Sequence, residues 1–393
     1  MGTTQNWKLA VQIGIQAQLT RGADCPPVHI LGGVGIGKTA FLESVASQGG
    51  YTFVPLSASQ IVPEFISGIP YADLSTGVAR LLPADLLLPL MECKAGRGIC
   101  LLDEMADATP MTSAAFHRLL THGEAGSQKL APRTAFVAAS NPPDVSTTGG
   151  QCSQAITTRC CTIPVNNDDG AAYTTPLKRY GVSGWEKDEV ISLPKDWQDG
   201  LPQMATLIAS FLEADVQWRV QVPSANETLG GILLGESAPA PNHRTWLFVV
   251  NLLTAAKSLN VPREVEKILV DGCVGETAAN ALYQYMTANQ LPNPEHLLNG
   301  KRPELPNRHD LLSAVMNSVV TAVIGNNTVP RYTAAFDVAE WIVQTTANEA
   351  VCAIAMVPLF STFPAGLGAP PAKVKMFMDI LQQSGMLERR QNG

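Results

Sequence analysis

Charged side chains are scarce in this 393-residue chain, at 16% of all residues, whereas a typical soluble protein carries about 25%. The 27 basic and 34 acidic residues give a net charge of −7, which disfavours a protein that coats nucleic acid through a generally basic surface. Low charge also disfavours extended disorder, which combines high net charge with low hydrophobicity. We therefore expect a folded chain with much uncharged surface, part of it buried against other subunits.

The sequence also lacks metal-binding, secretory and membrane-spanning patterns. The eight cysteines form no C-x-x-C pair and the six histidines show no metal-binding spacing, so buried thiols in a reducing compartment are the simplest interpretation. The first residues contain no long apolar run of the secretory type. The longest apolar stretch, residues 351–360, is about half the length that a membrane span needs. These absences predict a soluble, cytoplasmic protein that makes no membrane contact.

Short apolar runs alternate with helical segments over the first part of the chain. Buried strands are predicted at 28–31, 51–56, 99–102, 133–140 and 163–165. Such alternation predicts a parallel sheet covered by helices on both faces. The stretch 61–93 is expected to mix helix with loop. After residue 166 a linker and then helical signals follow, the last at 371–387.

These patterns divide the chain into three predicted parts. We expect an α/β domain over residues 1–166, a linker and helical lid over 167–300, and a helical extension over 301–393. The extension contains no recognisable motif.

A glycine-rich segment after the first predicted strand carries the strongest functional signal. It matches G-x-x-x-x-G-K-[ST] and lies between a strand and a helix, which is the setting that this pattern requires. Its glycines let backbone N–H groups surround a phosphate chain at the positive end of a helix. Lys38 can reach the β- and γ-phosphates, and the Thr39 hydroxyl can bind Mg²⁺. The predicted nucleotide-binding residues are Gly32, Gly33, Val34, Gly35, Ile36, Gly37, Lys38, Thr39 and Ala40.

Two further predicted strands run into polar residues. The strand at 99–102 is followed by Asp103 and Glu104, and the strand at 133–140 by Asn141. Ligands bind beyond the carboxyl ends of strands in open parallel sheets, so Asp103 is placed to hold Mg²⁺ and Glu104 to act as general base on the attacking water. Asn141 could hydrogen-bond the γ-phosphate, or it could cap a turn before proline. The acidic pair predicts hydrolysis of ATP rather than binding alone.

Together these segments resemble the AAA+ ATPases, and more narrowly their MoxR-like branch. The resemblance covers roughly residues 8–290 and rests on GGVGIGKT, ICLLDE, AASNPPD, AITTRCCTIPV and PNHRTW. It implies that Asn141 senses the γ-phosphate, that Arg159 is an arginine finger for the nucleotide of a neighbouring subunit, and that Arg244 reaches the γ-phosphate from the lid. It also implies a homo-oligomeric ring, most simply a hexamer, that uses ATP and Mg²⁺. Residues 119–136 resemble the family's hairpin before the Asn141 strand.

The two arginine motifs depart from the family pattern. Thr158 and Cys160 flank Arg159, where the family has an acidic residue and a phenylalanine, and Asn-His replaces Ser-Pro before Arg244. Arg159 could instead be a structural arginine at a helix end, and Arg244 could face solvent. Arg118 is a further candidate for the contact with a neighbour.

The resemblance implies a machine that uses ATP hydrolysis to remodel a protein or to load it with metal. Residues 274–298 resemble a region of MoxR-like ATPases that are encoded beside proteins with a von Willebrand factor A-type domain, which suggests a partner of that class. The same residues could simply be a lid helix and a loop. The alternatives are a nucleic-acid motor, which the acidic balance disfavours, and a nucleotide-gated scaffold, which Glu104, Asn141 and Arg159 disfavour.

Overall fold

The computed structural model describes residues 3–82, 84–93, 96–146, 150–165, 189–288, 292–305, 309–367, 374, 375, 377, 378 and 381. The chain divides into two compact units. Unit 1 comprises Met1–Gln198 and Gln217–Asn280, and unit 2 comprises Asp199–Val216 and Ala281–Gly393. The linker expected after residue 166 lies outside the described residues, and the last expected helix, 371–387, is described at five positions only.

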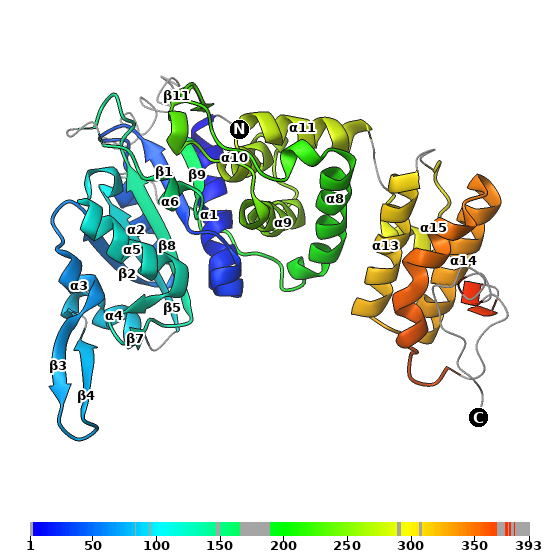
Figure 1. Ribbon diagram of the computed structural model, residues 1–393, viewed down its shortest axis with the longest axis horizontal. Coiled ribbons are helices and arrows are strands. Elements are labelled where there is room, and N and C mark those ends of the chain that lie inside the picture. Colours follow the sequence, from blue (N-terminus) through cyan, green and yellow to red (C-terminus); the bar gives the residue numbers. More distant parts are fainter. Residues whose placement is uncertain are drawn as a thin grey trace. The chain divides into compact units, whose positions relative to one another are not determined.

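Unit 1 is built around a five-stranded sheet in the order β2-β5-β8-β1-β9, in which every neighbouring pair is parallel. All five strands lie where the apolar runs predict them, and helices flank the sheet (Figure 1). This arrangement, together with the helical region that follows, confirms the predicted fold class. The strands are β1 (Val28–Gly32), β2 (Thr52–Ser57), β5 (Arg97–Asp103), β8 (Arg133–Ser140) and β9 (Cys161–Val165).

The interior strand β1, between β8 and the edge strand β9, positions the glycine-rich loop. All five of its residues are buried, because β8 and β9 lie on either side of it and helices cover the sheet. The register pairs Leu31 with Ser140 of β8 and Gly32 with Val165 of β9. The loop after Gly32 therefore emerges at the carboxyl edge of the sheet, beside the end of β8.

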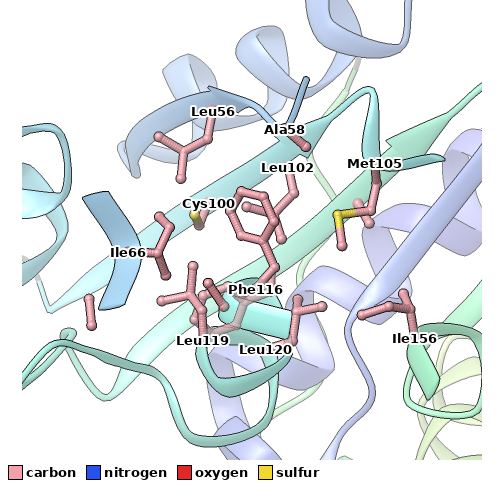
Figure 2. Packing of buried hydrophobic residues seen from close by; sticks show 14 of the residues in the cluster. Leu56, Ala58, Ile66, Cys100, Leu102, Met105, Phe116, Leu119, Leu120 and Ile156 are labelled. Atoms are coloured by element: carbon pink, nitrogen blue, oxygen red, sulfur yellow. The ribbon is translucent and has the colours of Figure 1, made fainter. Parts of the chain in front are cut away.

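The helix α5 (Pro110–His122) covers part of the sheet. Thr109 caps its first turn by accepting a hydrogen bond from the backbone N–H of Thr112. Figure 2 shows Phe116 and Leu119 of this helix beside Leu102 of β5 in one buried cluster. Each such side chain stabilises the fold by about 1.5–3 kcal/mol through removal from water. Asp103, the last residue of β5, and Glu104, which follows it, therefore stand at the end of a packed strand.

The described residues of unit 1 form three antiparallel hairpins, of which one, Thr228–Leu229 with Ile232–Leu233, follows the last strand of the parallel sheet and two lie between its strands. The first pairs β3 (Ile69–Asp73) with β4 (Val78–Leu82) and extends away from the sheet (Figure 1). This hairpin lies within 61–93, where the sequence predicts helix and loop. The sequence does not predict the hairpin because its side chains are exposed on both faces and so show no alternation of apolar and polar residues. The second pairs β6 (Glu124–Ala125) with β7 (Gln128–Lys129) and confirms the hairpin predicted before β8.

Helices from both ends of unit 1 pack against the edge of the sheet. Helix α10 (Arg263–Val274) approaches β9 so closely that a Cβ at Gly272 would collide with the carbonyl oxygen of Thr162. Asn242 caps α9 (His243–Ser258) through a reciprocal capping box with Thr245. The other long helices of this unit are α1 (Thr3–Arg21) and α2 (Lys38–Gly49), and the short elements are α3 (Pro63–Ser67), α4 (Leu88–Met91), α6 (Gln154–Thr157), β10 (Thr228–Leu229) and β11 (Ile232–Leu233).

Unit 2 is helical in its described residues. Its core is apolar and includes the aromatic residues Tyr332, Phe336 and Phe377. Among the described residues of the chain, no helix combines the length and the apolar character that crossing a lipid bilayer requires. The helices of unit 2 are α8 (Leu201–Ala214), α12 (Pro294–Leu298), α13 (His309–Gly325), α14 (Val329–Thr346) and α15 (Glu349–Met356). Helix α11 (Glu276–Ala288) includes residues of both units.

Candidate functional site

The loop between β1 and α2 has the backbone of a phosphate-binding loop. Gly35 and Gly37 have φ angles of 78° and 85°, in the left-handed region that glycine adopts most readily. A Cβ at either position would meet no atom within 4 Å, so glycine is required there by backbone conformation and not by crowding. Gly37 is also the N-cap of α2 and offers no side chain to the first N–H groups of that helix. The first N–H groups of a helix have no partner within the helix, and at such an N-terminus they can bind an anion.

Lys38 lies folded over this loop. Its Nζ donates hydrogen bonds to the carbonyl oxygens of Gly32 at 2.5 Å and Gly33 at 3.1 Å, and to Oδ1 of Asn141 at 3.1 Å. Partial burial lowers the pKa of Lys38, while the carboxylate of Asp103 acts in the opposite direction. Burial makes the charged form of the ammonium less favourable, and a nearby anion stabilises that charged form. The position of Lys38 is therefore suited to a phosphate group.

Thr39 and Asp103 present oxygen atoms to one another across the edge of the sheet. The Thr39 hydroxyl donates to Oδ2 of Asp103 over 2.9 Å. A hydroxyl and a carboxylate are hard oxygen ligands, and Mg²⁺ is usually held by one or two such protein groups together with substrate phosphates. No larger group of His, Cys, Asp and Glu side chains that could hold a metal occurs among the described residues. The pair fits a magnesium ion that binds together with a nucleotide.

Glu104 occupies an unusual backbone conformation at the end of β5. Its φ of 55° is left-handed, which costs a residue with a Cβ about 1–2 kcal/mol, and such outliers cluster at functional sites. Its backbone N–H donates to Oδ1 of Asp103, and its Oε2 accepts hydrogen bonds from the hydroxyls of Ser57, at 2.9 Å, and Ser59. The fold thus holds the Glu104 carboxylate in one place.

Sequence reasoning missed Ser57 and Ser59. Two serines after a strand have no characteristic spacing, and their role depends on the register that pairs Ser57 with Asp103. The sequence could have revealed them only through the parallel pairing of β2 with β5, which places the ends of both strands at the same edge. The structure thus brings the predicted residues Lys38, Thr39, Asp103, Glu104 and Asn141 together around the loop at 32–37, with the serines added.

The predicted arginines Arg159 and Arg244 lie together in a different place. Both line a cavity of about 300 Å³, together with Arg21 and with apolar side chains from α5 and α9. Burial lowers the pKa of Arg159, and the nearby charge of Arg244 lowers it further. Arg159 donates to the carbonyl oxygen of Ala155, and its Nε is buried without a hydrogen-bond partner among the described residues. Asp24 also lines the cavity and pairs with Arg21 at 3.0 Å, so the net positive charge of the lining comes from Arg159 and Arg244. The cavity, hereafter the arginine pocket, is therefore suited to an anion.

Arg118, the remaining predicted arginine, lies on α5. Its guanidinium forms an ion pair with Glu124 at 3.2 Å, and more than half of its side chain is exposed. The residues of this helix that line the arginine pocket are Leu120 and Thr121, and Arg118 is not among them. Arg118 is thus separate both from the phosphate-binding loop and from that cavity.

Comparison with known proteins adds little to what the geometry of the site indicates about function. No family model matches the chain, and no curated protein matches it either. Among solved structures, the chain is similar to a crystal structure described as a putative ATPase from Cytophaga hutchinsonii. The two are 12% identical with a TM-score of 0.41, over 72% of this chain and 96% of the other. At this distance the likeness carries no weight, and the assignment of function rests on the residues themselves.

Proposed function

We propose that this chain is a magnesium-dependent ATPase of the AAA+ type, most similar to the MoxR-like branch. One observation carries the proposal: Lys38, Thr39, Asp103, Glu104 and Asn141 converge at the carboxyl edge of a parallel sheet. A binding protein needs the loop and the lysine, but it does not need a carboxylate that is fixed by two hydroxyls beside the metal ligands. The strained Glu104 therefore favours hydrolysis over binding alone.

In this proposal each residue has a distinct task. The N–H groups of the loop and Lys38 hold the phosphates of ATP, and Thr39 with Asp103 holds Mg²⁺, which neutralises phosphate charge when bound. Glu104 accepts a proton from the water whose oxygen bonds to the γ-phosphorus. The bond between that phosphorus and the bridging oxygen to the β-phosphate breaks, which leaves ADP and phosphate. Asn141 hydrogen-bonds the γ-phosphate and orients it.

We further propose that the chain acts as a ring, most simply a hexamer, in which the arginine pocket of one subunit meets the nucleotide of the next. The support is physical. Arg159 and Arg244 place two positive charges close together, and an anion between them would relieve their repulsion. Because Arg244 shares the cavity with Arg159, both arginines would act on the neighbour's nucleotide. The low content of charged residues suits a subunit with two buried faces.

The proposed work of the ring is to remodel a protein partner or to load it with metal. The resemblance to MoxR-like ATPases supports a partner with a von Willebrand factor A-type domain. The net charge of −7 disfavours a nucleic-acid substrate, for which a basic surface is usual.

Two substitutions test the ATPase assignment. Lys38→Ala should abolish ATP binding, whereas Glu104→Gln should keep ATP binding and reduce turnover at least about 100-fold, which is the usual loss when a general base is removed. Glu264→Gln is the matched control, because it makes the same chemical change at an exposed position of α10. Unchanged turnover in Glu104→Gln would remove Glu104 from the mechanism.

Mixing experiments test the ring. Arg159→Ala and Arg244→Ala should each keep ATP binding and lose turnover. When Arg159→Ala subunits are mixed with Glu104→Gln subunits, some sites combine an intact Glu104 with an intact arginine from the neighbour, so part of the activity should return. If the mixture stays as inactive as its components, the arginine pocket does not act between subunits. Size-exclusion chromatography with and without ATP and Mg²⁺ measures assembly directly.

A further inference from the structure

A buried histidine lies on an interior strand of the sheet, and the proposed ATPase mechanism assigns it no task. His29 is on β1, only 2% of it is exposed, and its neighbours in register are Ala138 of β8 and Thr162 of β9. Buried polar groups are costly unless they are hydrogen-bonded. His29 meets this requirement through both ring nitrogens, as its contacts with side chains of the two flanking strands show.

The two nitrogens of His29 contact different parts of the chain. Nε2 lies 2.6 Å from Oγ of Ser140, the last residue of β8, and Nδ1 lies 3.3 Å from Oγ1 of Thr162. A third contact is made by Cys152, whose Sγ lies 3.8 Å from Nε2 and 4.0 Å from Oγ of Ser140. All four side chains are buried. They form one closed polar cluster, hereafter the His29 cluster.

The partners of His29 stand beside residues that the proposed mechanism uses. Ser140 directly precedes Asn141, which accepts a hydrogen bond from Lys38. Cys152 and Thr162 lie on either side of α6 and of Arg159, so His29 contacts the segment that carries this arginine at both of its ends. The His29 cluster therefore joins the end of β8, which precedes Asn141, to the segment that carries Arg159.

The hydrogen bonds of this cluster can run in two directions. Burial lowers the pKa of His29 to about 4, and the charge of Lys38 contributes to the same effect, so the ring is neutral near pH 7. A neutral imidazole has one donor and one acceptor nitrogen. Either Ser140 donates to Nε2 while Nδ1–H donates to Thr162, or both bonds reverse with the other tautomer. A two-state element of this kind can transmit a change from one site to another.

We propose that His29 is a positioning residue that couples Asn141, beside the bound nucleotide, to the segment of Arg159 that meets the next subunit. The proposal rests on the proposed ATPase function. A phosphate that competes for Lys38 changes the hydrogen bonding of Asn141 and its neighbour Ser140, and His29 passes this change to Cys152 and Thr162. The nucleotide bound to one subunit would thereby determine the position of the Arg159 that this subunit presents to its neighbour.

Three variants of the full-length chain test this. His29→Leu removes both hydrogen bonds and keeps an apolar side chain, while His29→Gln can still donate and accept. Ile30→Val is the matched control, because residue 30 points to the opposite face of the same buried strand. We would measure ATP affinity, turnover, and amide hydrogen exchange over residues 139–146, 150–165 and 97–103.

A coupling role predicts a specific pattern. In His29→Leu, turnover should fall at least about ten-fold with ATP affinity within about three-fold of the wild type, and exchange should rise over 139–146 and 150–165 but not over 97–103. His29→Gln should restore most of both properties, and Ile30→Val should change neither. Equal loosening of all three segments, or unchanged turnover in His29→Leu, would reduce His29 to an ordinary core residue.

Two further outcomes remain informative. If the wild-type chain hydrolyses no ATP, the proposed function fails. Hydrogen exchange in His29→Leu still shows whether His29 holds both 139–146 and 150–165. Faster exchange in only one of these two segments would refute the coupling. If His29→Leu does not fold, Ser140→Ala breaks only the β8 side of the cluster. It should lower turnover several-fold at unchanged ATP affinity, and wild-type turnover in that variant would refute the coupling.

Discussion

Replacement of Thr39 by valine should weaken the response of the enzyme to magnesium without unfolding the chain. The Thr39 hydroxyl donates to Asp103 over 2.9 Å, and valine keeps the shape of the side chain while it removes that oxygen. Because the bond is solvent-exposed, its loss should cost about 0.5–1.5 kcal/mol at most. For a unit of this size, that corresponds to a decrease in Tm of only about 1–6 °C.

The effect on metal binding should be much larger. Mutation of a residue that only supports a metal ligand already lowers metal affinity about 10–100-fold. Loss of a direct ligand should therefore raise the Mg²⁺ concentration at half-maximal turnover at least about ten-fold. The measurement is a Mg²⁺ titration of ATP turnover at saturating ATP, with Thr39→Ser as the control that keeps the oxygen. A wild-type Mg²⁺ midpoint in Thr39→Val would refute the assignment of the Thr39 and Asp103 pair as the magnesium site.

Three further predictions concern the backbone and the pH dependence of stability. Gly37→Ala should cost about 1–2 kcal/mol, because φ is 85° and no atom crowds the position; thermal unfolding measures this loss, and an unchanged Tm would contradict it. Gly272→Ala should cost about 1–3 kcal/mol through collision with β9, which urea unfolding would show. Burial raises the pKa of Asp271 to about 6 against the effect of Lys267, so its contribution to stability is present below about pH 4 and is lost as pH rises through about 6. Asp271→Asn should remove this pH dependence, worth about 3 kcal/mol, from the unfolding free energy, and an identical pH profile would show that Asp271 is not its cause.

The parallel sheet could be predicted because each core strand is a short apolar run next to a turn signal. A strand that is buried on both faces is a nearly continuous apolar run in the sequence, as at 99–102 and 133–140, and polar residues follow each of these two runs directly. The β3–β4 hairpin leaves no such trace, since its exposed side chains alternate in no particular way. Its existence depends on cross-strand pairing, which a local pattern does not encode.

The site shows the same division between local and distant information. The phosphate-binding loop is contiguous in sequence, so its residue types and spacing are sufficient to predict it. The serines that hold Glu104 come from another strand, and the shared cavity of Arg159 and Arg244 depends on how α9 packs beside α6 and α5. Such relations follow from the assembled fold and from no spacing along the chain.

The position of β1 between two strands that are made much later has a consequence for synthesis on the ribosome. Its partners β8 and β9 begin about one hundred residues or more after it ends, so at about 5–20 residues per second the strand waits several seconds for them. An unpaired apolar strand is prone to wrong pairing during that time. Helix α1 is made before β1 and packs so tightly on it that Gly14 has no room for a Cβ beside Val28, which lets α1 shield the strand. We expect ribosome-bound chains to bind nucleotide only after residue 165 has emerged, and nucleotide binding by shorter chains would show that β9 is dispensable.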